Sequence, residues 1–131
     1  MTQHIPESVL DLFQQPVLAH LATVMPDGTP QVTPVWVDFD GTHILVNTAK
    51  GRQKEINMQK RPQVGLDIVD PANPWHWISV RGKIAEITEE GALEHANKLT
   101  KKYTGNDTYQ NLQPGEVRVI CKITPERVIA R

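Results

Sequence analysis

The sequence is poor in residues on which several classes of protein depend. Its 131 residues include a single cysteine, Cys121, so no disulfide can form within the chain. A lone thiol fits a reducing compartment, and we expect a cytoplasmic protein. Aromatic residues make up only 5% of the chain, and tryptophan accounts for three of them. Any place where two large rings gather is therefore a candidate interface or ligand wall.

The chain also lacks an excess of charge of one sign. Lysine and arginine together number 14, aspartate and glutamate 15, and the formal net charge is −1. Without a global basic field we expect no nucleic-acid partner, and any anion site has to be local. The N-terminus has no basic start, and no run of about 18 apolar residues occurs, so we expect neither a signal peptide nor a membrane partner.

Familiar catalytic and metal-binding motifs are missing as well. The five histidines show no metal-ligand spacing, and with one cysteine no metal site is predicted. No GxSxG, Walker A or GxGxxG motif is present, and no nucleophile stands beside a base. Cys121 alternates with apolar residues and is most simply a core residue. If the protein is an enzyme, a cofactor carries the chemistry, and the sequence names no catalytic residue.

Apolar periodicity and turn residues predict one domain over residues 1–131 that is mostly β, an antiparallel β-barrel with accessory helices. Six strands are expected, at residues 17–24, 31–39, 43–48, 64–69, 75–87 and 116–123, with a turn after the last. The Asp-Gly pairs at 27–28 and 40–41 are hairpin turns, so the first three strands should form a meander. Pro34 marks a sheet edge, a bulge or a place where something other than a strand lies alongside. Gly82 allows a sharp bend in the fifth strand.

Three helices are expected between these strands. They cover residues 6–14, a segment that opens in 48–57 and ends near Lys60, and residues 89–103. Thr88 is expected to cap the last helix. Its apolar face is expected to consist of Ala92, Leu93, Ala96, Leu99 and Tyr103. The polar loop that follows, 103–116, is long enough to be functional or mobile.

The stretch TAKGRQKEIN, residues 48–57, places three cations where the helix macrodipole disfavours them. Lys50, Arg52 and Lys54 come at every second position. They are either solvated surface charges or a phosphate site at a helix start, where free N–H groups attract an anion and Gly51 permits close approach. Their position in a strand–glycine–helix turn favours the phosphate site.

Two segments carry the tryptophans. In the segment around Trp36, the preceding Pro34 leaves backbone groups free, and a planar ring could lie along that edge. The simpler interpretation makes Trp36 a core residue. Trp75 and Trp77 share one face of a strand. They either cover one end of the barrel or form an interface or a ligand wall.

The ordered set LATVMPDGTPQVTPVW, NTAKGRQKEINMQKRPQVGL, NPWHWISVRGKIAEI, YTG and VRVICKITPERV resembles the pyridoxamine 5′-phosphate oxidase-like flavin and deazaflavin oxidoreductases. It is most similar to the small split-barrel branch that uses the deazaflavin coenzyme F420. The resemblance covers nearly the whole chain. It implies a six-stranded split barrel, a homodimer, and a cofactor groove at the subunit interface.

The resemblance also implies cofactor-binding residues. Arg52 and Lys54 match the basic pair at the cofactor phosphate, with Lys50 an additional cation and Gly51 in the same turn. The strand along the ring is matched by Gln31, Val32, Thr33, Pro34, Val35 and Trp36. Asn47 and Thr48 match the ribityl-phosphate side, and Trp75 and Trp77 fall where this branch has aromatics near the groove.

The sequence departs from the pyridoxamine phosphate oxidases proper. It has Gly51-Arg52-Gln53-Lys54 in place of their Ser-Arg-Lys run, and it lacks their usual C-terminal segment. Vitamin B6 oxidation is therefore not expected. The expected function is hydride transfer from F420 to an electron-poor small-molecule substrate, such as a conjugated alkene, a quinone or a tetrapyrrole.

Three alternatives remain open at this point. The same fold could use FMN, against which Lys50 counts mildly, because FMN has one phosphate and no acidic tail. A non-catalytic flavin- or haem-binding carrier or sensor would need no proton donor. A barrel without any cofactor would leave Lys50, Arg52 and Lys54 as surface charge.

Overall fold

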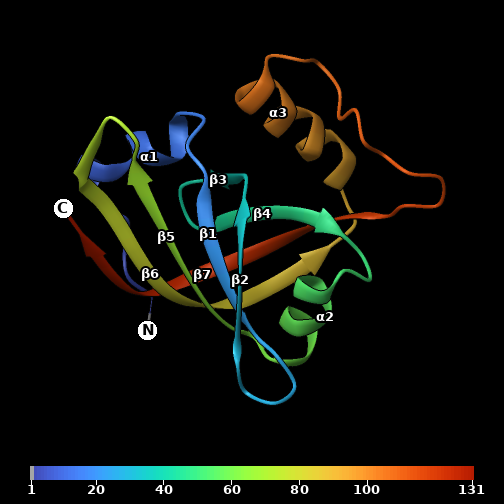
Figure 1. Ribbon diagram of the computed structural model, residues 1–131, viewed down its shortest axis with the longest axis horizontal. Coiled ribbons are helices and arrows are strands. Elements are labelled where there is room, and N and C mark those ends of the chain that lie inside the picture. Colours follow the sequence, from blue (N-terminus) through green and yellow to red (C-terminus); the bar gives the residue numbers. More distant parts are fainter. Residues whose placement is uncertain (1) are drawn as a thin grey trace.

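The computed structural model describes residues 2–131 as one curled antiparallel sheet with helices at its ends (Figure 1). The strands are β1 Ala19–Val24, β2 Pro30–Val35, β3 Val37–Phe39, β4 Ile44–Ala49, β5 Gln63–Asp70, β6 Asn73–Thr88 and β7 Arg118–Ala130. The helices are the 3₁₀ turn η1 Glu7–Val9, then α1 Asp11–Gln14, α2 Gln53–Lys60 and α3 Ala92–Thr104. The strand order is β2-β1-β5-β6-β7-β4-β3. This confirms the predicted mostly-β split barrel with accessory helices, with seven strands in the described residues rather than six.

The two edges of the sheet meet at a single residue. β2 lies at one edge and β3 at the other, yet only Trp36 separates them in the chain. The expected strand 31–39 is therefore two strands. Pro34 sits in β2 opposite His20 of β1, in a strand with one neighbour, so its missing N–H costs no ladder bond on the open side. The edge position predicted for Pro34 is confirmed.

The predicted three-strand meander is wrong. β1 pairs with β2 and β3 pairs with β4, but β2 and β4 do not pair. After β2 the chain crosses the open side of the barrel instead of turning back, so the two hairpins lie at opposite edges of the sheet. The Asp-Gly turns were correctly placed, but they do not decide which hairpin neighbours which.

The last strand is longer than predicted, and the expected turn after it is absent. β7 continues through residues 124–127, and its pairing with β6 shifts register beside Gly82. At Gly82 a Cβ atom would lie 2.4 Å from the carbonyl oxygen of Thr124. The glycine expected to bend β6 is therefore required because the β7 backbone approaches it closely.

Helix α3 begins later than predicted. Its N-cap is Gly91 rather than Thr88, whose hydroxyl instead accepts a hydrogen bond from the Glu90 N–H at 3.1 Å. Ala92, Ala96 and Leu99 are buried as predicted, whereas Leu93 is 47% exposed. The buried face of α3 differs from the predicted apolar face because it includes His95 and Thr100.

The main core lies inside the curl of the sheet. Its buried members come from every strand and from the N-terminal segment; they include Leu12, Phe13, Ile44, Ile68 and Ile123. Cys121 is fully buried among them, and burial raises the pKa of its thiol to about 12. The prediction that Cys121 is a core residue is confirmed. No helix in residues 2–131 is both long enough and apolar enough to cross a membrane.

Replacing Gly82 with alanine should destabilise the protein by about 1–3 kcal/mol, because the new methyl group has to push the β7 backbone away. Chemical unfolding followed by circular dichroism measures this loss. The matched control is Gly65→Ala in β5, where a Cβ meets nothing nearer than the Val80 carbonyl oxygen at 3.7 Å. Equal stability losses in the two variants would contradict the close approach.

Candidate functional site

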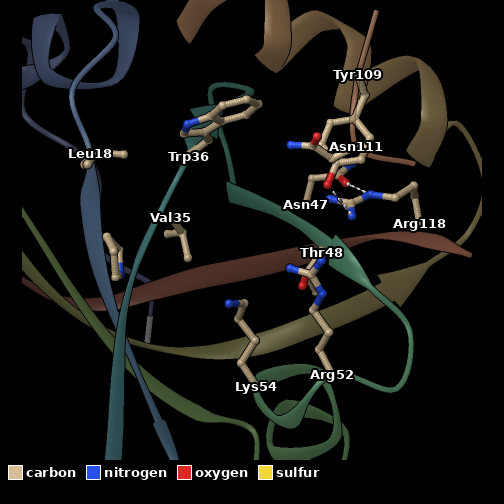
Figure 2. A pocket seen from close by; sticks show the side chains of 11 residues that line it. Leu18, Val35, Trp36, Asn47, Thr48, Arg52, Lys54, Tyr109, Asn111 and Arg118 are labelled. Atoms are coloured by element: carbon tan, nitrogen blue, oxygen red, sulfur yellow. Dashed lines mark hydrogen bonds between the residues drawn. The ribbon is translucent and has the colours of Figure 1, made fainter. Parts of the chain in front are cut away.

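A pocket of about 290 Å³ lies where the chain crosses from β2 to β3 (Figure 2). Strands β2, β4 and β7, the residue before β1, the start of α2 and the loop after α3 all contribute to it. Its lining residues are Leu18, Pro34, Val35, Trp36, Asn47, Thr48, Arg52, Lys54, Tyr109, Asn111 and Arg118. A larger cavity of about 470 Å³ between α1, β3 and α3 contains none of the sequence-predicted site residues.

Two of the three cations at the start of α2 belong to this pocket. The side chains of Arg52 and Lys54 both point into it (Figure 2). Lys50 does not line the pocket, and its ammonium group pairs with Glu89 at 3.2 Å on the surface. The stretch 48–57 therefore divides its charges between the pocket and the surface.

The start of α2 is stabilised by the acidic side chain of Glu55, which follows the three cations in the sequence. Glu55 is only 2% exposed, and its carboxylate accepts a hydrogen bond from the Gly51 N–H at 2.8 Å. A carboxylate in the first turn offsets the positive end of the macrodipole. With Glu55 in that role, Arg52 and Lys54 are free to point into the pocket.

The cations in the pocket are poorly compensated. Burial lowers the pKa of Lys54, and the positive charges of Arg52 and Arg118 lower it further. Among the described residues, the Lys54 ammonium group has one hydrogen bond, to the Thr33 hydroxyl at 3.4 Å. Within residues 2–131, the Arg52 side chain has no hydrogen bond or ion pair. Such a group of cations favours an anion as its ligand.

Thr48 points to the same conclusion. Its side chain is 1% exposed, and its hydroxyl oxygen has no hydrogen-bond partner in the described part of the chain. Buried polar atoms normally have a partner, because leaving one without costs about 1–3 kcal/mol. A phosphate-bearing cofactor fits these residues, since it brings acceptors both for the unpaired cations and for the Thr48 hydroxyl.

One wall of the pocket is an aromatic ring held from behind. The Trp36 indole stacks on Tyr103 of α3, with ring centroids 5.2 Å apart and planes within 9°. The Tyr103 hydroxyl donates to the Val17 carbonyl at 2.7 Å and accepts from the Val37 N–H at 3.1 Å. Trp36 is thus oriented by packing and hydrogen bonds, and it presents a flat surface beside the free edge of β2.

The opposite wall contains a buried arginine. Arg118 is 9% exposed, and its Nε–H donates to Asn47 Oδ1 at 2.9 Å. Its Nη1 pairs with Glu116 at 3.2 Å, and its guanidinium lies 4.6 Å from the centre of the Tyr109 ring. Figure 2 shows this guanidinium between the Tyr109 ring and Thr48.

Half of the sequence-predicted site residues meet in the pocket. These are Pro34, Val35, Trp36, Asn47, Thr48, Arg52 and Lys54. Of the others, Thr33 contacts Lys54, Gly51 donates to Glu55, and Lys50 pairs with Glu89.

The remaining predicted residues lie elsewhere. The Gln31 amide oxygen accepts from buried Asn57 of α2 at 3.4 Å, which ties the helix to β2. Val32 is 60% exposed on the opposite face of β2. Trp75 is 82% exposed near the start of β6, and Trp77 is half-buried with the Arg131 guanidinium 5.8 Å from its ring. Within this single chain, neither tryptophan lines the pocket.

Sequence reasoning missed four pocket residues. They are Leu18, Tyr109, Asn111 and Arg118. Tyr109 and Asn111 lie in the loop 103–116, whose length and polarity were the available signal. Arg118 was hidden, because a basic residue that alternates with valines is typical of the exposed face of a strand.

Comparison with known proteins supports a family assignment. The family model described as pyridoxamine 5′-phosphate oxidase matches residues 5–131. A solved structure described as an F420 reductase is 31% identical, with a TM-score of 0.86, and the match covers 97% of this chain and 100% of that one. A conserved hypothetical protein from Mycobacterium tuberculosis is 27% identical, with a TM-score of 0.76 and 97% and 84% coverage. HupZ of Group A Streptococcus, 24% identical with a TM-score of 0.70 over 96% and 93%, shares the fold. A search of curated proteins finds no match.

The electrostatics of the pocket can be tested through Lys54. Replacing Arg52 with alanine should raise the pKa of Lys54, because it removes a neighbouring positive charge, and added inorganic phosphate should raise it because it brings a negative charge. NMR titration of ¹³C-labelled lysine follows the change. Lys50→Ala is the control and should leave the Lys54 signal in place. A Lys54 pKa that responds equally to both substitutions would argue against a local cluster.

Proposed function

This chain belongs to the pyridoxamine 5′-phosphate oxidase family, and we propose that it is an oxidoreductase that binds the deazaflavin F420. On this proposal it transfers hydride to an electron-poor small-molecule acceptor, such as a conjugated alkene, a quinone or a tetrapyrrole. The observation that carries the proposal is the pocket itself. It combines unpaired cations, a buried hydroxyl without a partner and a flat aromatic wall beside a free strand edge. The 31% identity to a chain described as an F420 reductase supports the choice of cofactor.

Arg52 and Lys54 are proposed to hold the phosphate. Arginine can bind a phosphate through two parallel hydrogen bonds, and lysine adds a point charge. An anion between them would offset their mutual repulsion, which adds to burial in lowering the pKa of Lys54. The Thr48 hydroxyl would gain the partner that it lacks.

The crossing from β2 to β3 is proposed to hold the ring. Pro34 offers no N–H, and β2 has no neighbouring strand on its outer side, so backbone groups around Pro34 are available to the polar edge of a planar ligand. Trp36, held by Tyr103, limits where that ring can lie. A fixed ring position is the protein's main contribution to hydride transfer.

When bound, a reduced deazaflavin supplies the hydride. The described lining of the pocket contains no carboxylate and no imidazole. The part of the protein is therefore to position the acceptor and restrict the site, and water would suffice as the source of the proton that completes the reduction.

FMN remains the second candidate, because the sequence-based argument against FMN rested on Lys50. This lysine was the sequence-based reason to expect an acidic cofactor tail, and its pairing with Glu89 outside the pocket weakens that reason. Arg118 takes its place as the third cation of the pocket, but Glu116 partly neutralises it. The F420 proposal thus depends on Arg118 and on the similarity to the F420 reductase chain.

We also propose that the protein is a homodimer with the cofactor at the subunit interface. A tryptophan as exposed as Trp75, 82%, is unusual for a monomer, and large aromatic residues are enriched in interfaces. Leu18 at the mouth of the pocket and Val32 on the edge strand are exposed as well, at 47% and 60%. A partner seated there would cover apolar surface and complete the groove.

Equilibrium fluorescence titration with F420 and with FMN tests the cofactor. We expect F420 to bind more tightly, and Arg52→Ala or Lys54→Ala to weaken it at least about tenfold, which is the usual cost of losing a charged hydrogen bond. Lys50→Ala is the matched control, a lysine in the same stretch that faces away from the pocket. Tighter FMN binding would favour a flavin oxidoreductase. Failure of both ligands to bind would refute the proposed function.

Replacing Trp75 with serine should weaken the dimer about tenfold or more, because buried tryptophans are common hot spots. Analytical ultracentrifugation over a concentration series measures the dissociation constant. Leu93→Ser provides the control, since Leu93 is also exposed but lies on α3. A monomer at all concentrations, or a dimer unaffected by Trp75→Ser, would refute this arrangement.

A further inference from the structure

A line of buried and half-buried polar side chains runs from β3, beside α3, to the pocket. Asp38 of β3 contacts His95 Nε2 at 3.1 Å, and His95 Nδ1 contacts the Asn47 Nδ2 amide at 3.2 Å. Asn47 Oδ1 then accepts from Arg118 Nε at 2.9 Å. None of the four belongs to the Arg52–Lys54 pair that is proposed to hold the phosphate; Asn47 and Arg118 line the pocket, whereas Asp38 and His95 do not.

The donors and acceptors along this line fit in only one direction. Arg118 can only donate, so the Asn47 atom facing it has to be the oxygen. The amide nitrogen of Asn47 therefore donates to the Ala92 carbonyl, at 2.8 Å, and to His95 Nδ1. His95 accepts at Nδ1 and carries its proton on Nε2, which donates to Asp38.

Asp38 anchors the line with a fixed negative charge. Burial would raise the pKa of Asp38, but hydrogen bonds from His95, from the Phe39 N–H and from Lys98 together hold it well below its usual range. An ionised Asp38 accepts from His95 Nε2 and so favours the tautomer whose Nδ1 accepts from Asn47. The side chain of His95 is 8% exposed, so the arrangement is enclosed by protein.

Arg118 is the end of the line that a ligand can reach. Its Nε is bonded to Asn47 and its Nη1 to Glu116, while its Nη2 has no hydrogen bond in the described residues. The guanidinium lines the pocket and lies against the Tyr109 ring. Both ends of the Asn47 amide are occupied by protein partners, so Asn47 acts on a ligand through Arg118.

We propose that Arg118 binds an acidic group of the ligand and that His95 is the positioning residue that holds Arg118 in place. His95 acts through Asn47, because His95 Nδ1 and the Ala92 carbonyl are the two acceptors that keep the amide nitrogen turned away from Arg118 and the amide oxygen toward Arg118 Nε. The ligand chemistry is a phosphate or carboxylate oxygen shared between Arg118 and the Arg52–Lys54 pair. This proposal rests on the proposed function for the identity of the ligand, but not for the positioning of Arg118.

The positioning role can be measured without any ligand. In the wild-type protein, the Arg118 Nε–H should exchange slowly with water in ¹⁵N NMR spectra, because it is buried and hydrogen-bonded. His95→Leu removes the acceptor at Nδ1, and Asn47→Ala removes the acceptor for Nε, so both should accelerate this exchange. His95→Asn can place an amide oxygen near the Nδ1 position and should preserve most of the protection. Unchanged exchange in His95→Leu would overturn the proposal.

A double-mutant cycle tests the consequence for binding. His95→Leu should weaken F420 binding about three- to tenfold, the range expected for one lost hydrogen bond. The same substitution should have no further effect in an Arg118→Ala background, whereas it should add to the effect of Arg52→Ala. Lys98→Ala is the control: it removes another partner of Asp38, with a side chain 71% exposed, and should leave binding unchanged. Equal effects of His95→Leu with and without Arg118 would show a merely structural role and overturn the proposal.

The two proposals fail in different ways. If neither F420 nor FMN binds, the proposed function falls, and the cycle is repeated with inorganic phosphate while the exchange measurement still decides the role of His95. If F420 binds but the cycle is additive, the proposed function stands and the positioning role of His95 is refuted.

Discussion

The crossing of the chain at Trp36, from one edge of the sheet to the other, is the constraint on which the rest of the structure depends. β2 and β3 are the first and last strands of the sheet order, and a single residue joins them. A flat sheet cannot satisfy this connection, because its outer strands would be several strand widths apart. The sheet therefore has to curl until its edges meet, and the place where they meet without pairing is where the pocket opens.

Helix α3 stabilises that crossing from outside the sheet. Its last turn supplies Lys102, whose ammonium group bonds the carbonyl oxygens of Phe13 and Val37, and Tyr103, whose ring supports Trp36. Its first turns supply Ala92 and His95, which bond Asn47 on the other wall. One helix thus holds both walls of the pocket. A disturbance of α3 should therefore reach both the ring wall and the cation wall, although they lie on different strands.

The fold class and seven of the eleven pocket residues could be predicted because their signals are local. Hairpin turns, strand alternation and the strand–glycine–helix turn at 48–57 each depend on residues close together in sequence. The break at Trp36 was missed because its causes are distant: the stacking of Tyr103 is 67 residues away in the chain and leaves no trace near Pro34. Arg118 was missed for a similar reason, since its burial depends on Asn47 of the distant strand β4 as well as on Tyr109 and Glu116 of the loop before β7.

Residues 48–57 place cations at the start of α2, where the helix macrodipole disfavours them, and Glu55 explains how the helix tolerates them. Glu55 is buried at the helix start and bonds the Gly51 N–H, so α2 does not depend on an anion from solution in order to form. The remaining cost falls on Arg52 and Lys54: burial and the neighbouring cations lower the pKa of Lys54, and the Arg52 guanidinium has no partner in the described residues. That cost is recovered only when an anion binds the folded pocket, because the unfolded chain does not bring these cations together. Binding and folding stability are therefore linked through this pocket. An anionic ligand should stabilise the native state in proportion to the logarithm of its concentration above its dissociation constant.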